Sequence, residues 1–343
     1  MNIVVIGGGT GSTVVLEGIK RFKELKLSVI VGMMDDGGSN AVVRDEFGLL
    51  PLSDVRKSIL ALADSQSNEV LRELFTYRFS EGNAIKGHTV GNLLMVSMTE
   101  ILGSEVEAIE MFKNIFSVRG DIIPVTLDDV KLTAEYDDGS KVVGEHYIDE
   151  PKKHKNITTF SLSSPAKASE AAIRAIEKAD YIILGPGDLY TTIMPNLLVS
   201  GIKEALISSK AKIIYIGNLM SKIGQTRHKT HRDIVQIIED AIGRKFDFVL
   251  LNNGQFPPQA YKRYLEDGEH TIEDNLHDGE GRLVLRKNLV AFDPIKKEKG
   301  DSLKRSFIRH DSDKLARELY AIFNMKRNKL LKILSTFFGY YRD

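Results

Sequence analysis

The sequence contains no cysteine among its 343 residues. Disulfide bonds, catalysis by a thiolate and metal sites built from cysteine are therefore excluded. No uninterrupted apolar run approaches the roughly 20 residues that a membrane-spanning helix needs. Residues 1–6 run straight into glycines and do not form the apolar core of a signal peptide. Together these absences lead us to expect a cytoplasmic location.

An excess of charge of either sign is also lacking. The chain has 47 basic and 47 acidic residues, so its formal net charge is zero. Proteins that bind nucleic acid usually carry a clear basic excess on the binding domain. The composition therefore predicts no nucleic-acid partner.

Short apolar runs of the kind buried in parallel sheets recur along the chain. They lie at residues 2–6, 28–34, 181–184, 212–216 and 248–251. Helical patterns separate them, for example in residues 11–25, where Val15 and Ile19 share one face. The alternation predicts an α/β fold with a doubly wound, mainly parallel sheet. Because no repeat or low-complexity linker interrupts residues 1–324, we predict a single domain over this length.

Residues 120–163 depart from the alternation. Two β-like runs flank Asp138-Gly139 there, which is a strong hairpin signal, so we predict an inserted antiparallel β lobe. Just before it, Ser104 and Glu107 have the spacing of a capping box and mark the start of a helix. The side chains expected to bury that helix are Val106, Ile109, Phe112 and Phe116.

Residues 325–343 form a tail of different character. Five basic side chains and one acidic side chain alternate there with apolar and aromatic ones. This composition predicts a basic amphipathic helix. We expect it to dock on its own domain or on a second subunit; the alternative is contact with an anionic membrane surface.

A glycine-rich turn follows the first predicted strand and opens the first predicted helix. It comprises Gly7, Gly8, Gly9, Thr10 and Gly11. A backbone without side chains can approach a phosphate closely, and the start of a helix offers free N–H groups to an anion. Ser12 stands where the dinucleotide fingerprint has its third glycine, so a plain tight turn is the alternative interpretation.

Acidic and polar side chains follow the second strand. Asp35 and Asp36 lie among glycines, where two carboxylates could bind a hard cation such as magnesium or orient a substrate hydroxyl. Asp54 has the sequence context of a helix N-cap. His88 and Asn92 precede or begin an apolar helix, over residues 93–98, that we expect to be buried with its polar end toward the cleft.

Two further loops follow later strands. Gly185, Gly187 and Thr191 belong to the first of them, and Asn218 belongs to the second. Their amides and hydroxyls could hold a phosphate. Because parallel strands end at the same edge of a sheet, three such loops together predict a nucleotide cleft there.

With these segments together, the chain closely resembles the bacterial gluconeogenesis factor family, which is related to the 2-phospho-L-lactate transferases. The resemblance covers residues 1 to about 324. The motifs that carry it are GGGTG (7–11), DDGGS (35–39), EFGLLPLSDVR (46–56), GHTVGNLL (87–94), LGPGDLYTTIMPNLLVSGI (184–202), NLMSKIGQT (218–226) and IRHD (308–311).

The resemblance implies a Rossmann-like core, cytoplasmic residence and a role in cell shape during growth on gluconeogenic carbon. It also implies a UDP-sugar ligand, UDP-N-acetylglucosamine, surrounded by the turn at 7–11, the loop at 185–187 and Asn218. Tyr264 and Arg309 match positions where the family holds the ligand. Asp188 departs from the family's usual serine, and a carboxylate at this loop would repel a phosphate.

Two enzymatic alternatives accompany this hypothesis of a regulator that binds a UDP-sugar. In the transferase branch, Asp35 and Asp36 would assist magnesium-dependent transfer of a phospholactyl group from a nucleotide diphosphate to a deazaflavin hydroxyl. An NAD-dependent oxidoreductase is disfavoured by the incomplete fingerprint. The segment at 50–64 matches the regulator branch better than the transferase branch, so we favour the regulator. Magnesium is the one cofactor under consideration. The oligomeric state is left open, and a homo-oligomer is one possibility.

Overall fold

The computed structural model describes residues 1–64, 69–149, 156–279, 281–292 and 307–325. The tail from residue 326 onward lies outside the described residues, and so does the prediction made for it. No helix in the described part has the length and apolarity that crossing a membrane requires.

Seven parallel strands form the central sheet, in the order β10-β9-β8-β7-β1-β2-β3. Their bounds are β1 Asn2–Gly7, β2 Lys26–Val31, β3 Asp121–Pro124, β7 Tyr181–Leu184, β8 Lys212–Ile216, β9 Phe248–Asn252 and β10 Leu283–Lys287. From β1 the chain adds strands in one direction, and from β7 it adds them in the other. This confirms the predicted doubly wound sheet.

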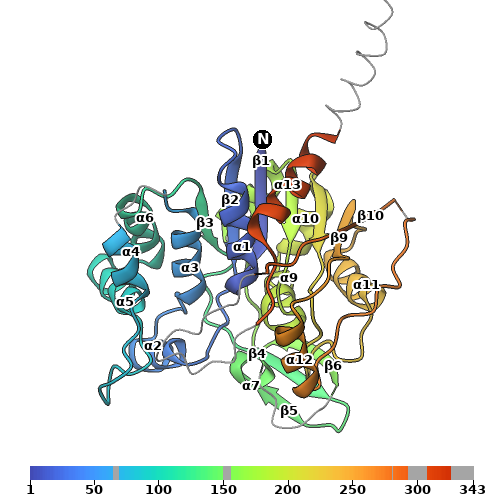
Figure 1. Ribbon diagram of the computed structural model, residues 1–343. Helices are drawn as coiled ribbons and strands as arrows, with labels where there is room; N and C mark the ends of the chain where they lie inside the picture. The colour runs from blue at the N-terminus through green and yellow to red at the C-terminus, as the bar shows by residue number, and fades with distance from the viewer. Residues whose placement is uncertain (65–68, 150–155, 280, 293–306, 326–343) are drawn as a thin grey trace, which may run out of the picture.

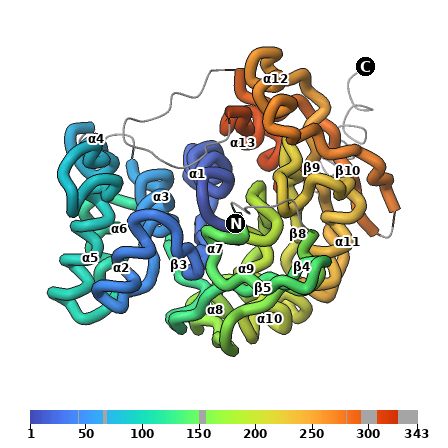
Figure 2. Tube along the Cα trace, turned by 90° about the horizontal axis from the view of Figure 1, so that it is seen from below, coloured from blue at the N-terminus to red at the C-terminus, as the bar shows by residue number. Residues whose placement is uncertain are grey.

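Helices cover both faces of the sheet and its edge (Figures 1 and 2). Those of the first half are α1 Gly9–Ile19, α2 Ser39–Phe47, α3 Ser53–Leu62, α4 Glu69–Thr76, α5 Val90–Leu102 and α6 Glu105–Ile115. Those of the second half are α7 Glu145–Asp149, α8 Glu170–Lys178, the π-helix η1 Leu189–Ile193, α9 Met194–Leu197, α10 Ile202–Ser208, α11 His231–Ile242, α12 Pro258–Glu266 and α13 Ser312–Phe323.

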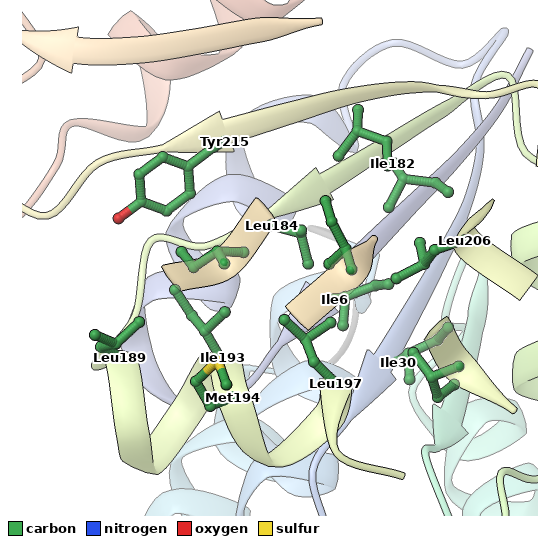
Figure 3. Close-up of a cluster of buried hydrophobic side chains, with 14 of the residues drawn as sticks. Ile6, Ile30, Ile182, Leu184, Leu189, Ile193, Met194, Leu197, Leu206 and Tyr215 are labelled. Carbon is green, nitrogen blue, oxygen red and sulfur yellow. The ribbon is translucent and has the colours of Figure 1, made fainter. Parts of the chain in front are cut away.

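Alternate residues of each strand build two separate cores. Ile3 and Val5 of β1 pack with α1, α3 and α13 on one face. Val4 and Ile6 pack with α8, α10 and α11 on the other, where Ile6 lies among Leu184, Leu197 and other side chains in Figure 3. Both faces are covered, which explains why these strands are continuous apolar runs in the sequence.

The antiparallel lobe is a three-stranded sheet in the order β5-β4-β6, where β4 is Leu132–Tyr136, β5 is Lys141–Val143 and β6 is Ile157–Leu162. Its β4–β5 hairpin turns at Gly139, whose φ is +78°, as the Asp138-Gly139 pair predicts. The predicted lobe was too long at its start. Residues 121–124 form β3, which pairs in parallel with β2 and ends the main sheet.

Three local predictions need correction. β2 ends at Val31 and not at Met34, because its partner β1 ends at Gly7, opposite Val31. Val106 is 43% exposed, since it lies roughly a quarter-turn outside the buried stripe of α6. Leu94 is 40% exposed, so the apolar start of α5 is only partly buried.

Candidate functional site

The order of the strands reverses between β1 and β7, and the carboxyl ends of these strands are the expected place for a ligand. The loops after the two strands touch there. A Cβ added to Gly11 would lie 2.0 Å from the carbonyl oxygen of Pro186. Gly11 is therefore required for the close approach of the two glycine loops.

The side chain of Asp54, a residue of α3, binds the first amide of α1. The amide of Gly9 donates to Asp54 Oδ2 at 2.8 Å, and Lys57 Nζ donates to Asp54 Oδ1 at 2.8 Å. Burial alone would raise the pKa of Asp54, but Lys57 and the Gly9 amide lower it below its ordinary value, so the group is ionised. Asp54 thus caps α1 across 45 residues of sequence and does not act as the N-cap of its own helix, which is Leu52.

Asp35 and Asp36 point to different partners. Asp35 accepts hydrogen bonds from the Gly37 amide at 2.9 Å and from Asn40 Nδ2 at 2.7 Å. Asp36 Oδ1 accepts from the amide of His146 in the β lobe at 3.0 Å. No group of three or more metal-binding side chains exists in the described part of the chain. Magnesium at Asp35 and Asp36 stays a prediction.

Asp35, Asp54 and Glu145 lie close enough at the carboxyl edge of the sheet for their charges to interact. Burial, together with the nearby Asp54, raises the pKa of Asp35. Burial also raises the pKa of Glu145 in α7 well above its ordinary value, and the charges of Asp35 and Asp149 raise it further. Burial and the neighbouring acidic charges thus disfavour ionisation of both carboxyl groups.

His88 and Asn92 belong to a buried polar network that joins α2, α3 and α5. Ser39 Oγ lies 2.8 Å from His88 Nδ1 and 3.3 Å from Asn92 Nδ2. Asn92 also donates to Ser53 Oγ at 3.1 Å and accepts from Arg56 Nε at 2.9 Å. The network positions three helices, and His88 and Asn92 both use protein partners within it.

Lys222 connects the β lobe to the second glycine loop. Its ammonium group contacts the carboxylates of Asp149, at the end of α7, and of Asp188, at 2.7 Å. These two carboxylates raise the pKa of Lys222 against the opposing effect of burial, so it is charged. The charge of Asp188, expected to repel a phosphate, is balanced here by Lys222.

Two predicted ligand residues brace this same loop. The side chain of Asn218 accepts from the Gly187 amide at 3.0 Å and donates to the Gly187 carbonyl at 2.9 Å. Thr191 Oγ1 donates to Asp149 at 3.0 Å and accepts from Gln225 at 3.1 Å. Both side chains therefore hold loops together at the edge of the sheet.

Tyr264 lies in a small separate core beside the loop that follows β8, and Arg309 directly follows Ile308 of that core. Tyr264 packs with Leu219 and Met220, next to Asn218. Its hydroxyl accepts a hydrogen bond from the amide of Phe307 at 3.1 Å, two residues before Arg309. The structure therefore places Asn218, Tyr264 and Arg309 on one side of the edge, while His88 and Asn92 lie on the other.

Several residues of the site were missed from the sequence. Lys222 lies in the segment NLMSKIGQT (218–226), but nothing in that segment marks it as a partner of acidic side chains. Asp149 and Glu145 come from the inserted lobe. Nothing local in the sequence indicates that α7 packs against η1, as it does here. These residues meet through tertiary structure alone.

The geometry defines a doubly wound α/β protein in which the glycine loops after β1 and β7 meet at the carboxyl edge of the sheet. Residues 3–290 match the model of the family described as 2-phospho-L-lactate transferase CofD. A gluconeogenesis factor from Listeria innocua is 36% identical over 328 residues, covering 95% of this chain and 97% of its own. One from Bacillus subtilis is 35% identical over 318 residues, covering 92% and 95%.

A crystal structure of a UPF0052-family protein from Bacillus halodurans has the same fold. It superposes with a TM-score of 0.81 at 33% identity, over 92% of this chain and 98% of that one. The chain therefore belongs to the gluconeogenesis factor family, within the wider CofD group.

Proposed function

We propose that the protein is a cytoplasmic regulator that binds a UDP-sugar, UDP-N-acetylglucosamine, and links this ligand to cell shape during growth on gluconeogenic carbon. The observation that carries the proposal is the junction of two glycine loops at the switch point, where Gly11 meets Pro186. The names of the Listeria innocua and Bacillus subtilis relatives support the link to gluconeogenesis.

The charges at the cleft favour a particular orientation of the ligand. The first amide of α1 already donates to Asp54, so this helix start has less to offer an anion. The carboxyl groups of Asp35 and Glu145 suit hydroxyl groups of a ribose or sugar. The diphosphate is better matched by Arg309, on the side of the cleft where Tyr264 packs.

A transferase reaction is the second candidate, because the matching family model is that of a 2-phospho-L-lactate transferase. Asp35 accepts hydrogen bonds from Gly37 and Asn40, and Asp36 accepts one from His146. Because the described part of the chain holds no group of three or more histidine, aspartate or glutamate side chains that could bind a metal ion, we favour binding over catalysis.

Calorimetry tests the proposal directly. The purified protein should bind UDP-N-acetylglucosamine with micromolar affinity, or about 8 kcal/mol, and should bind GDP and NAD much more weakly. Tight binding of NAD without a response to the UDP-sugar would refute the proposal. Saturable GDP binding that needs magnesium would favour the transferase.

Arg309→Ala should weaken binding of the UDP-sugar by about 1.5–3 kcal/mol, the usual contribution of a charged hydrogen bond. The matched control is Arg174→Ala, at an exposed arginine of α8 paired with Glu170. The control should bind like the parent protein. A folded Arg309→Ala protein with parental affinity would remove Arg309 from the site.

A further inference from the structure

A basic hollow lies at the amino edge of the sheet, opposite the proposed nucleotide cleft. It has a volume of about 330 Å³ and opens between the end of α1 and the starts of β2 and β3. Its lining residues are Lys20, Phe22, Lys23, Leu25, Lys26, Leu27, Arg119, Gly120 and Asp121. Four of these nine residues carry a positive charge and one carries a negative charge.

The acidic groups near the basic hollow have partners of their own. Asp121 is paired with Lys113 at 3.2 Å, and Asp64 accepts from Arg119 at 3.2 Å. Glu24, in the same turn as Lys23, accepts a hydrogen bond from the hydroxyl of Tyr320 at 2.8 Å. Arg119 and Asp121 thus each have a charged partner, and the excess of positive charge at the hollow comes from its three lysines.

Lys20 is held in place at the hollow. Its Nζ donates to the carbonyl of Ala63 at 3.0 Å. Burial lowers the pKa of this lysine and Arg72 lowers it further, while Glu17 and Asp64 act in the opposite direction. An anion placed beside Lys20 would favour its charged form against the effect of burial.

The wall of the hollow is built rigidly. Phe22 stacks on Tyr320 of α13 with ring centroids 4.1 Å apart. Its amide donates to the carbonyl of Ile19, and the amide of Leu25 donates to the carbonyl of Phe22 at 3.0 Å. The turn therefore holds an apolar surface beside the cations without needing to rearrange.

We propose that the basic hollow is a second ligand site that binds a phosphorylated small molecule, independently of the nucleotide cleft. The four cations match a phosphate group, which forms strong charge-assisted hydrogen bonds with lysine and arginine. The volume is at the lower end of small-molecule pockets, and the apolar wall contacts the organic part of the ligand. The site lies across the sheet from the cleft, so occupying it leaves the cleft open.

Pyrophosphate and phenyl phosphate are the probes, titrated by calorimetry with ionic strength held constant by sodium chloride, since salt screens exposed charges. Both should bind the full-length protein with one-to-one stoichiometry. Lys23→Ala with Lys26→Ala should weaken both by roughly tenfold or more. The matched control replaces two exposed lysines elsewhere, Lys210→Ala with Lys262→Ala, and should leave affinity unchanged.

A second arm separates this site from the cleft. Saturating UDP-N-acetylglucosamine should not displace the phosphate probes. Displacement would place the probes in the nucleotide cleft and overturn the proposal. Unchanged affinity in the Lys23 and Lys26 variant, or the absence of saturable binding at constant ionic strength, would also overturn it. If the UDP-sugar fails to bind, the proposed function is refuted while the lysine variants still decide the basic hollow.

Discussion

Two buried histidines flank Gly217, where the chain leaves β8 for the loop that braces the cleft. A Cβ on Gly217 would lie 3.0 Å from His231 Cε1, and His310 hydrogen-bonds to the backbone of Gly217. Burial lowers the pKa of each histidine to about 4. In each ring one nitrogen, Nδ1 of His231 and Nε2 of His310, has no hydrogen-bond partner in the described part of the chain.

The sign of the resulting pH dependence follows from linkage. A histidine with a pKa of about 6.5 when unfolded and about 4 when folded binds more protons in the unfolded state between these values. The contribution to stability is therefore complete above pH 6.5 and is lost as pH falls toward 4. At pH 5 the loss is about 2 kcal/mol for each histidine, relative to pH 8.

His310→Asn isolates one of the two contributions. The asparagine can still donate to the Gly217 carbonyl but does not titrate. Urea unfolding at pH 8 and pH 5 should show an acid-induced loss of stability smaller by about 2 kcal/mol than in the parent protein. His277→Asn, at an exposed histidine, is the control and should keep the parental difference. A His310→Asn protein with the parental pH profile would show that burial does not hold this imidazole neutral.

Substitutions at Gly11 and Lys222, each with a comparison variant, test the contacts at the carboxyl edge of the sheet. Thermal or urea unfolding should show that Gly11→Ala destabilises the protein by about 1–3 kcal/mol, because the added Cβ meets the Pro186 backbone. In the same assay Gly9→Ala should cost about 1 kcal/mol, because the added Cβ meets no atom but the φ of +61° disfavours alanine. Equal costs would contradict the close approach. Lys222→Met should cost about 1–3 kcal/mol, since the partly exposed Asp188 loses its partner. A second change, Asp188→Asn, should recover part of this in the same assay, and a lack of recovery would argue against the ion pair.

The local sequence predicted much of the architecture. The apolar runs at residues 181–184 and 212–216 are β7 and β8 with the same bounds. Ser104 accepts from the amide of Glu107, as its spacing indicates. Such features depend on residues a few positions apart, so the sequence carries them directly.

The sequence could not tell which sheet a short strand would join. Residues 121–124 are as apolar as the strands of the lobe, yet they pair with β2 in the main sheet. Periodicity describes the faces of a strand and says nothing of its neighbours. The position of β3 depends on α6, whose buried face packs against the same core as β2.

The sequence by itself determined that glycine loops would follow parallel strands and meet at one edge, because parallel strands must end there. Only the tertiary structure decided what each polar side chain does at that edge. Asp54 caps a helix 45 residues away, and Lys222 joins Asp149 to Asp188. Such bonds form between loops that packing brings together, and the energy of a charge depends on the burial and partners it finds there.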